Sequence, residues 1–193
     1  MREDPIERFR LWFRAARRCR TIEDATAACL STMDPAGLPN GRMVLLKDFD
    51  ARGFVFYTNL HSLKGKSLQK TPRAALTFYW APLKKQVRIQ GRTEIVSDAE
   101  ADAYWATRPR LAQLGAWASK QSDILSSRAI LLKDVARLAL KYGRRPIPRP
   151  SYWTGVRVIP RKMEFWQGRA NRLHDRILYD KTSRGWVVIR LYP

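Results

Sequence analysis

The chain has 193 residues, of which 45% are hydrophobic and 11% aromatic, and this composition suits one globular domain with a real core. Its 37 Lys and Arg residues against 17 Asp and Glu residues give a net charge of +20, which favours phosphorylated small molecules or nucleic acid as partners. No apolar run approaches the roughly 18 residues of a membrane span, and no apolar signal core follows the charged N-terminus, so we expect a soluble, cytoplasmic protein without a membrane partner.

The first predicted element is an amphipathic helix over residues 4–18. Asp4 can cap this helix, Pro5 suits its first position, and apolar residues then recur at spacings of three and four. Its outer arginines could contact the phosphates of a nucleic acid, but we favour a solvated face on a helix that caps the core. The two cysteines, Cys19 and Cys29, lack metal-ligand spacing, so we expect buried free thiols and neither a disulfide nor a metal site.

Between residues 26 and 95 the pattern changes to short strands. Strand-like runs are separated by Gly, Asp and Pro turns, which is typical of an antiparallel sheet or barrel. Arg42 and Lys47 lie at the two ends of the run at 41–48, whose interior is apolar. In the last run, Gln86 and two further polar residues alternate with apolar ones, so one face of this strand is polar and could line a flavin site.

A short helix is expected to interrupt these strands. Ser62 can cap a helix through residue 68, with Lys64 in its first turn. Free backbone N–H groups beside a lysine at a helix start form a natural phosphate site. Ser-capped surface helices with lysines are common, so this signal is weak when taken alone.

Residues 97–142 form a predicted helical segment. A capping box begins a helix that would place Tyr104 and Arg108 on one face, and Pro109 ends it. Helical spacing returns over 129–142. A tyrosine and an arginine four residues apart can bind one phosphate, although an ordinary surface pair is equally compatible with this spacing.

Residues 153–193 complete the predicted sheet, with strands expected at 153–159, 162–166, 176–179 and 186–191. Within this region, residues 164–176 read EFWQGRANRLHDR and combine paired aromatic residues with cations. Arg172, His174 and Arg176 alternate, so on an extended backbone all three would face one side as a cationic wall for a planar anionic ligand. An edge strand with solvated charges is the alternative.

The EFWQ motif, followed four residues later by RLHDR, resembles the signature of the pyridoxamine 5′-phosphate oxidase family. The resemblance continues in order and spacing through residues 42–47, 56–59, 86–88, 104–109, 120–122 and 190–193. It implies an α+β fold, the FMN-binding split barrel, in which an antiparallel β-barrel is surrounded by helices within a single domain of residues 1–193. It also implies a homodimer with active sites at the interface, each drawing residues from both chains.

The resemblance also implies roles for individual residues. Those expected to bind FMN are Arg42, Met43, Val44, Leu45, Leu46, Lys47, Tyr57, Thr58, Lys64, Gln86, Gln121, Ser122, Trp166 and Arg176. Those expected to bind the substrate are Lys47, Tyr104 and Arg108 at its phosphate, with Arg172 and His174 near the pyridine ring as the catalytic pair. The implied reaction, in vitamin B6 metabolism, oxidises pyridoxamine or pyridoxine 5′-phosphate to pyridoxal 5′-phosphate. Hydride passes from C4′ to N5 of FMN, and dioxygen is reduced to hydrogen peroxide.

Three positions depart from the family pattern. Leu63 replaces an arginine expected beside the FMN phosphate, Ala112 replaces a serine expected at the substrate phosphate, and Thr154 replaces a glycine. A charge-assisted hydrogen bond is worth about 1.5–3 kcal/mol, so we expect weaker binding of FMN or of the substrate.

Other functions are compatible with parts of the sequence. A diverged flavin oxidase could act on another substrate, as in the related phenazine-pathway proteins, and a flavin- or vitamer-binding protein with weak turnover would suit Leu63 and Ala112. A nucleic-acid-binding module is supported only by the net charge. The chain has two histidines and no HExxH, P-loop or GxGxxG motif, which disfavours zinc hydrolases, P-loop NTPases and Rossmann dehydrogenases. We favour the oxidase because the expected substrate-binding residues are otherwise retained.

Overall fold

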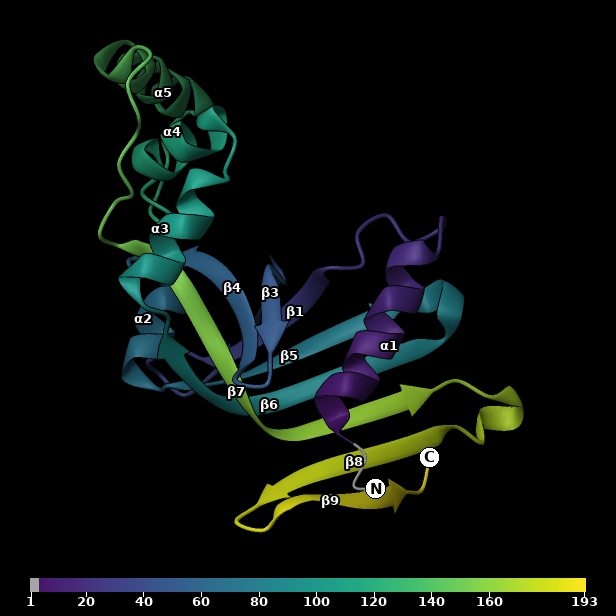
Figure 1. Ribbon diagram of the computed structural model, residues 1–193. Helices are drawn as coiled ribbons and strands as arrows, with labels where there is room; N and C mark the ends of the chain where they lie inside the picture. Colours follow the sequence, from purple (N-terminus) through teal and green to yellow (C-terminus); the bar gives the residue numbers. More distant parts are fainter. Residues whose placement is uncertain (1–3) are drawn as a thin grey trace.

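The computed structural model describes residues 4–193 as a curled antiparallel sheet with helices at two of its sides (Figure 1). The helices are α1 (Pro5–Arg18), α2 (Leu63–Lys70), α3 (Asp98–Ala106), α4 (Arg110–Ala118) and α5 (Arg128–Tyr142), with 3₁₀ turns η1 (Ala81–Leu83) and η2 (Ala170–Arg172). The strands are β1 (Ala27–Met33), β2 (Pro39–Leu45), β3 (Asp48–Asp50), β4 (Gly53–Asn59), β5 (Arg73–Trp80), β6 (Lys85–Ile95), β7 (Trp153–Gln167), β8 (Asp175–Thr182) and β9 (Gly185–Leu191). They lie in the order β2-β1-β5-β6-β7-β4-β3, and β8 pairs with β7 and β9.

The sheet curls into a barrel because its two end strands, β2 and β3, are almost continuous in the chain. Between them the backbone N–H of Leu46 donates to Thr26 O and that of Lys47 donates to Val55 O, each at 2.9 Å. At this corner the backbone therefore stops pairing with β1 and begins to pair with β4. The prediction of one strand over 41–48 is wrong here, because a single straight strand cannot pair with both neighbours. Arg42 lies within β2, and Lys47 lies in the corner.

Strand β7 joins the two ends of the molecule. The sequence predicted two strands here, but β7 runs unbroken past Pro160 because the partner strand β6 shifts register between Gln90 and Gly91. A Cβ atom on Gly91 would lie 1.8 Å from Ile159 O, so only glycine fits at this position. With 15 residues, β7 has a contour length of roughly 45–50 Å. Its first half pairs with β4 and its second half with β8.

Helix α1 packs its apolar face against the curled sheet and caps the core, as the amphipathic pattern predicted. The Phe9 ring is fully buried, with its centroid 4.8 Å from that of Phe54 and 5.2 Å from that of Phe78. The predicted cap is confirmed, since Asp4 Oδ1 accepts a hydrogen bond from the backbone N–H of Ile6 at 2.9 Å. The cysteines are free and half-buried.

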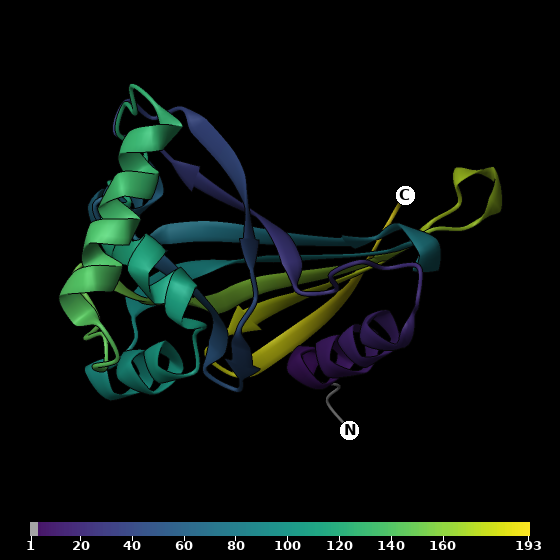
Figure 2. The same cartoon turned by 90° about the horizontal axis from the view of Figure 1, so that it is seen from above.

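Helices α2 to α5 gather at one end of the strands, and the loop at 168–174 projects at the other (Figure 2). The predicted capping box of Ser97 and Glu100 is present at the start of α3. Helix α4 was not predicted, because Pro109 suggested a helix end whereas it stands at the N-cap of a new helix. Residues 4–193 contain no helix that is long and apolar enough to span a membrane.

Candidate active site

A cavity of about 530 Å³ lies between β2, β4 and the helices α2 to α4. It brings together many residues that were predicted to bind FMN or the substrate. Those that line it are Met43, Val44, Leu45, Lys47, Tyr57, Thr58, Lys64, Tyr104, Arg108 and Gln121. Ala112, the position where the family has a serine, also lines it.

The start of α2 forms one cationic end of this cavity. The side chain of Ser62 caps the helix by accepting from the backbone N–H of Gly65 at 3.2 Å. Lys64 Nζ lies 3.2 Å from Ser62 Oγ and donates to Gln121 Oε1 at 2.7 Å. Burial, with a smaller contribution from the charge of Arg42, lowers the pKa of Lys64 to about 8. Within residues 4–193 the ammonium group of Lys64 has no anionic partner.

Two predicted FMN contacts support this end without lining the cavity. Ser122 Oγ accepts from the backbone N–H of Leu63 at 3.3 Å, which connects the loop after α4 to the start of α2. Arg42 Nη1 donates to Thr32 Oγ1 at 2.7 Å, and burial lowers the pKa of Arg42. Leu46, predicted as a further contact, is buried in the core at the corner between β2 and β3.

Arg108 forms a second cationic end. Its guanidinium carbon lies 4.4 Å from the centroid of the Trp153 ring, and its Nη2 donates to Ala112 O at 2.9 Å. Burial lowers the pKa of Arg108. The Tyr104 ring stacks on that of Tyr57, with the ring centroids 3.9 Å apart. Helix α3 ends before Arg108, but Tyr104 and Arg108, both predicted to contact the substrate phosphate, still line one cavity.

Two buried polar atoms of this region have no hydrogen-bond partner among the described residues. They are Arg108 Nε and Thr58 Oγ1, and both residues line the cavity. Buried polar atoms without partners are uncommon in proteins, and at a cavity wall they indicate a polar ligand. Together with Lys64, this set of donors fits an anionic molecule and therefore the phosphate groups of FMN and of the proposed substrate.

The remaining predicted residues lie at the other end of the molecule. Gln86, Trp166 and Arg176 stand opposite one another on β6, β7 and β8, on one face of the sheet. The centroid of the His174 ring lies 4.6 Å from that of Trp166, and His174 Nδ1 accepts from the backbone N–H of Arg169 at 3.1 Å.

The prediction that Arg172, His174 and Arg176 share one face of an extended strand is wrong. Strand β8 begins only at Asp175, and Arg172 belongs to η2 with a φ of +60°. The backbone turns here because the loop is closed by contacts between its two ends, including an ion pair between Arg169 Nε and Asp175 Oδ2 at 2.7 Å. Alternation in the sequence could not reveal this turn.

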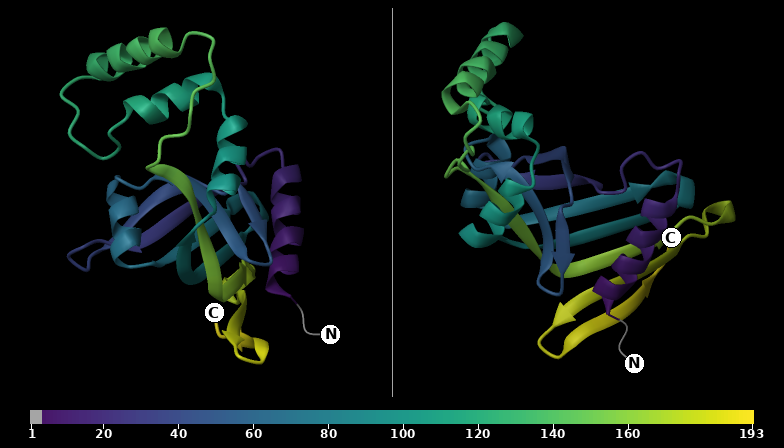
Figure 3. Two further views of the ribbon diagram at one scale, coloured as in Figure 1. Left: turned by 60° about the vertical axis from the view of Figure 1, so that its left-hand side comes forward. Right: turned by 45° about the horizontal axis from the view of Figure 1, so that its top comes forward.

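The two groups of predicted site residues are separate within one chain. Trp153, at the first residue of β7, lines the cavity described above, whereas Trp166 lies near the last residue of the same strand. Figure 3 shows the loop at 168–174 far from α2 to α4 in both views. A single chain therefore does not bring Arg172 and His174 to the cavity.

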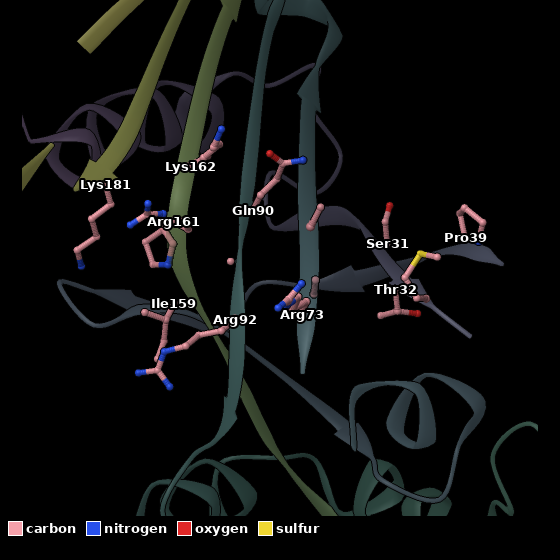
Figure 4. Close-up of a pocket in the computed structure, with 15 residues that line it drawn as sticks. Ser31, Thr32, Pro39, Arg73, Gln90, Arg92, Ile159, Arg161, Lys162 and Lys181 are labelled. Carbon is pink, nitrogen blue, oxygen red and sulfur yellow. The ribbon is translucent and has the colours of Figure 1, made fainter. Parts of the chain in front are cut away.

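A larger cavity, of about 870 Å³, lies elsewhere on the sheet and contains none of the predicted site residues. Figure 4 shows its cationic side chains over β5 to β8, and these are Arg73, Arg92, Arg161, Lys162 and Lys181. Three of them have acidic partners, since Arg92 lies 3.7 Å from Glu94 and both Arg161 and Lys162 lie within 4 Å of Asp180. Cationic charge alone therefore does not locate the candidate site in this protein.

Sequence reasoning missed several residues of the 530 Å³ cavity. Trp153 contributes the ring over which Arg108 lies, and the sequence indicated it only as the first residue of a strand at 153–159. Gly115 and Ala116 belong to α4, which lies within the predicted helical segment 97–142 but was not recognised as a separate helix. Their small side chains leave room beside Ala112, but small residues in an unrecognised helix give no signal in the sequence.

Comparisons with known proteins agree with this arrangement. A family model described as pyridoxamine 5′-phosphate oxidase matches residues 16–142, and one described as the pyridoxine 5′-phosphate oxidase C-terminal dimerisation region matches residues 153–193. The chain belongs to the pyridoxamine 5′-phosphate oxidase family. Two relatives named pyridoxine/pyridoxamine 5′-phosphate oxidase come from Caulobacter vibrioides and Brucella anthropi. They are 50% and 52% identical over 191 residues, which are 99% and 98% of this chain and 86% and 94% of the relatives.

Solved structures of this oxidase family share the fold. PhzG from Burkholderia lata, crystallised with tetrahydrophenazine-1-carboxylic acid, has a TM-score of 0.92 and 32% identity over 98% of this chain and 93% of that one. A pyridoxamine 5′-phosphate oxidase-related, FMN-binding protein from Nostoc punctiforme has a TM-score of 0.78 over 100% of both chains, and at 18% identity it shows the fold alone. The predicted split-barrel fold is confirmed.

Proposed function

We propose that the protein is an FMN-dependent oxidase that converts pyridoxine or pyridoxamine 5′-phosphate into pyridoxal 5′-phosphate. The observation that carries this proposal is the 530 Å³ cavity with two cationic ends, Lys64 at one and Arg108 at the other. The reaction needs two phosphate sites, one for the cofactor and one for the substrate. A nucleic-acid surface would need neither this cavity nor its buried unpartnered donors.

The residues at the start of α2 fit the phosphate of FMN. Lys64 supplies the charge, and Arg42 and Ser122 add donors close to it. Gln121 accepts from Lys64 in the structure, so FMN phosphate would replace an existing contact of that lysine. FMN, when bound, supplies the acceptor for the hydride that leaves C4′ of the substrate.

The residues at the other end of the cavity fit the phosphate of the substrate. Arg108 holds its guanidinium against Trp153, so the unpartnered Nε is fixed in direction before a ligand arrives. Tyr104 is oriented by its stacking on Tyr57, and Lys47 lies in the corner at the cavity edge. These contacts orient the substrate, and no residue of the cavity needs to act as a strong base.

A second copy of the chain completes the proposed site. Gln86, Trp166 and Arg176 would meet the flavin of the partner chain, and Arg172 and His174 would meet the pyridine ring. This proposal is supported by the separation of the two groups along β7 and by the match of residues 153–193 to a dimerisation region.

In the overall reaction the substrate loses two electrons and two protons, which dioxygen takes up as hydrogen peroxide. The amine also consumes water and releases ammonia.

A diverged flavin oxidase is the second candidate. The solved structure of PhzG at a TM-score of 0.92 contains a tricyclic carboxylic acid, and Ala112 removes one expected phosphate donor. Retention of Lys47, Tyr104 and Arg108 around the cavity favours a phosphate ester over such a carboxylic acid. Comparing pyridoxine 5′-phosphate with pyridoxine as substrates separates the two, because only the first candidate depends on the phosphate.

The test is an assay of the purified protein with added FMN in air. We expect equal amounts of pyridoxal 5′-phosphate and hydrogen peroxide to form from pyridoxine 5′-phosphate. Arg108→Ala should raise the KM for this substrate, whereas Arg73→Ala, which removes a cation from the other cavity, should not. A protein that binds FMN and forms neither product contradicts the oxidase, and a protein that binds no FMN contradicts the cofactor as well.

A further inference from the structure

A buried carboxylate lies beside the row of residues proposed to contact the flavin. Glu164 is two residues from Trp166 on β7, so both side chains are on one face of the sheet. Trp166 stands opposite Arg176 in the register of β7 and β8. Only 8% of the surface of Glu164 is exposed, and the proposed mechanism gives it no role.

Glu164 holds Arg176 through one of its carboxylate oxygens. Arg176 Nε donates to Glu164 Oε1 at 2.8 Å, and Arg176 Nη2 lies 2.8 Å from the same atom. The other oxygen, Oε2, accepts from Arg88 Nη1 at 3.1 Å. Because each oxygen is bound to a different guanidinium, the carboxylate has one orientation, and Arg176 is fixed by it.

The guanidinium of Arg176 keeps donors that face away from Glu164. An arginine side chain has five N–H groups in one plane. Arg176 uses its Nε and Nη2 toward Glu164, and its Nη1 donates to Tyr192 O at 3.0 Å. Its Nη1 and Nη2 each have a second N–H, and the plane in which these lie is set by the contacts already made. Arg176 thus presents an oriented pair of donors on the face that carries Trp166.

Glu164 also supplies the negative charge between the guanidinium groups of Arg88 and Arg176. It is the carboxylate between Arg88 and Arg176, and removing it would leave the two guanidinium groups facing each other. The cations would then repel, and Arg176 would move away from the orientation that the carboxylate imposes.

We propose that Glu164 is a positioning residue that holds the Arg176 guanidinium in the orientation that binds the flavin. This inference rests on the proposed function, in which Arg176 contacts the FMN bound by the partner chain. Glu164 acts through Arg176 and does not touch the flavin.

A double-mutant cycle on FMN affinity tests this inference. The FMN dissociation constant is measured by quenching of flavin fluorescence for the wild type, Glu164→Gln, Arg176→Ala and the double variant. We expect Glu164→Gln to raise the dissociation constant about 10-fold in the wild-type background. We expect it to have no effect in the Arg176→Ala background, because its effect passes through Arg176.

Two controls separate positioning from general stability. Asp180→Asn removes a β8 carboxylate that lies 3.3 Å from Lys162, and it should leave the FMN dissociation constant unchanged. Glu164→Asp keeps the charge and should fold, but its shorter side chain cannot hold both arginines, so it should also weaken FMN binding. Urea unfolding of each apo-protein reports stability independently of FMN.

The outcomes are distinct. Equal losses of FMN affinity from Glu164→Gln in both backgrounds would show a structural role and overturn the inference, as would wild-type affinity in Glu164→Gln and Glu164→Asp. In either case a wild-type protein that binds FMN leaves the proposed function standing. A wild-type protein without FMN affinity would overturn the proposed function and this inference together.

Discussion

Lys64 is held in surroundings that disfavour its charged form. Because burial lowers its pKa to about 8, the apo-protein loses this proton in the mildly alkaline range. A bound phosphate would raise the pKa of Lys64, so binding above pH 8 must be accompanied by proton uptake. We therefore expect FMN affinity to be constant between pH 7 and the apo pKa, and then to fall by up to about tenfold per pH unit.

The measurement is a series of FMN titrations from pH 7 to 10. Lys64→Arg is the matched control, because its guanidinium stays charged over the whole range and should flatten the profile. An unchanged affinity of the wild type across this range would contradict the role of Lys64 in binding the phosphate.

Leu63 is a residue whose replacement should strengthen FMN binding. It follows the cap residue of α2 and is 59% exposed, beside Lys64 and the backbone contact with Ser122. Leu63→Arg would add the cation that the family usually has there, and we expect the FMN dissociation constant to fall about 10-fold. Leu140→Arg adds the same charge on α5, where residue 140 is 86% exposed, and serves as the control. Equal gains in both variants would mean that net charge alone attracts FMN.

At the scale of elements, one buried arginine connects α3 to the sheet. Arg157 on β7 is 2% exposed and lies 2.6 Å from Glu100 on α3, 3.3 Å from Asp50 and 3.6 Å from Glu94. Arg157→Ala would leave these carboxylates close together without a cation, so we expect a loss of about 3–5 kcal/mol in the free energy of unfolding. Urea unfolding measures this loss. Arg161→Ala, on the same strand with its side chain 65% exposed, should cost less than about 1 kcal/mol, and similar losses in both would contradict the argument.

Local signals in the sequence predicted the elements that depend on neighbouring residues. The cap at Asp4 and the alternation around Gln86 are of this kind, and the structure contains both. The corner at Lys47 and the passage of β7 past Pro160 depend on partner strands far away in the chain, so no local pattern predicts them. The turn at Arg172 depends on a loop closed by its own side chains, and simple alternation was misleading there.

In the candidate site, too, some features could be predicted from the sequence and others depend on distant parts of the structure. Most assignments of residues to FMN or to the substrate came from the resemblance to the family, and ten of these residues line one cavity in the structure. Neither the resemblance to the family nor the structure of one chain explains how Arg172 would reach that cavity. Trp153 and Trp166 lie near opposite ends of β7, so one chain does not bring the two groups together, and in the proposed dimer the partner chain would supply Arg172.

At the scale of the whole molecule, this separation predicts complementation between two variants that each have impaired turnover at low substrate concentration. Arg108→Ala damages the cavity, and Arg172→Ala damages the loop at the other end of β7. In a hybrid dimer of these two variants, the intact cavity of one chain would meet the intact loop of the other, so one active site is restored. Random exchange makes half of the dimers hybrid, and each has one good site of two, so we expect about a quarter of the wild-type turnover.

The measurement mixes the two purified variants after mild denaturation and refolding with FMN, then follows formation of pyridoxal 5′-phosphate. Mixing Arg108→Ala with Lys47→Ala is the control, since both substitutions damage the cavity and every hybrid site would have one damaged cavity. Recovery in the first mixture and none in the second would show that each site is built from two chains. Absence of recovery in the first mixture, with hybrid dimers demonstrated by mass after ¹⁵N labelling of one variant, would mean that Arg172 acts within its own chain. The long strand β7 would then have to bend to bring its two ends together.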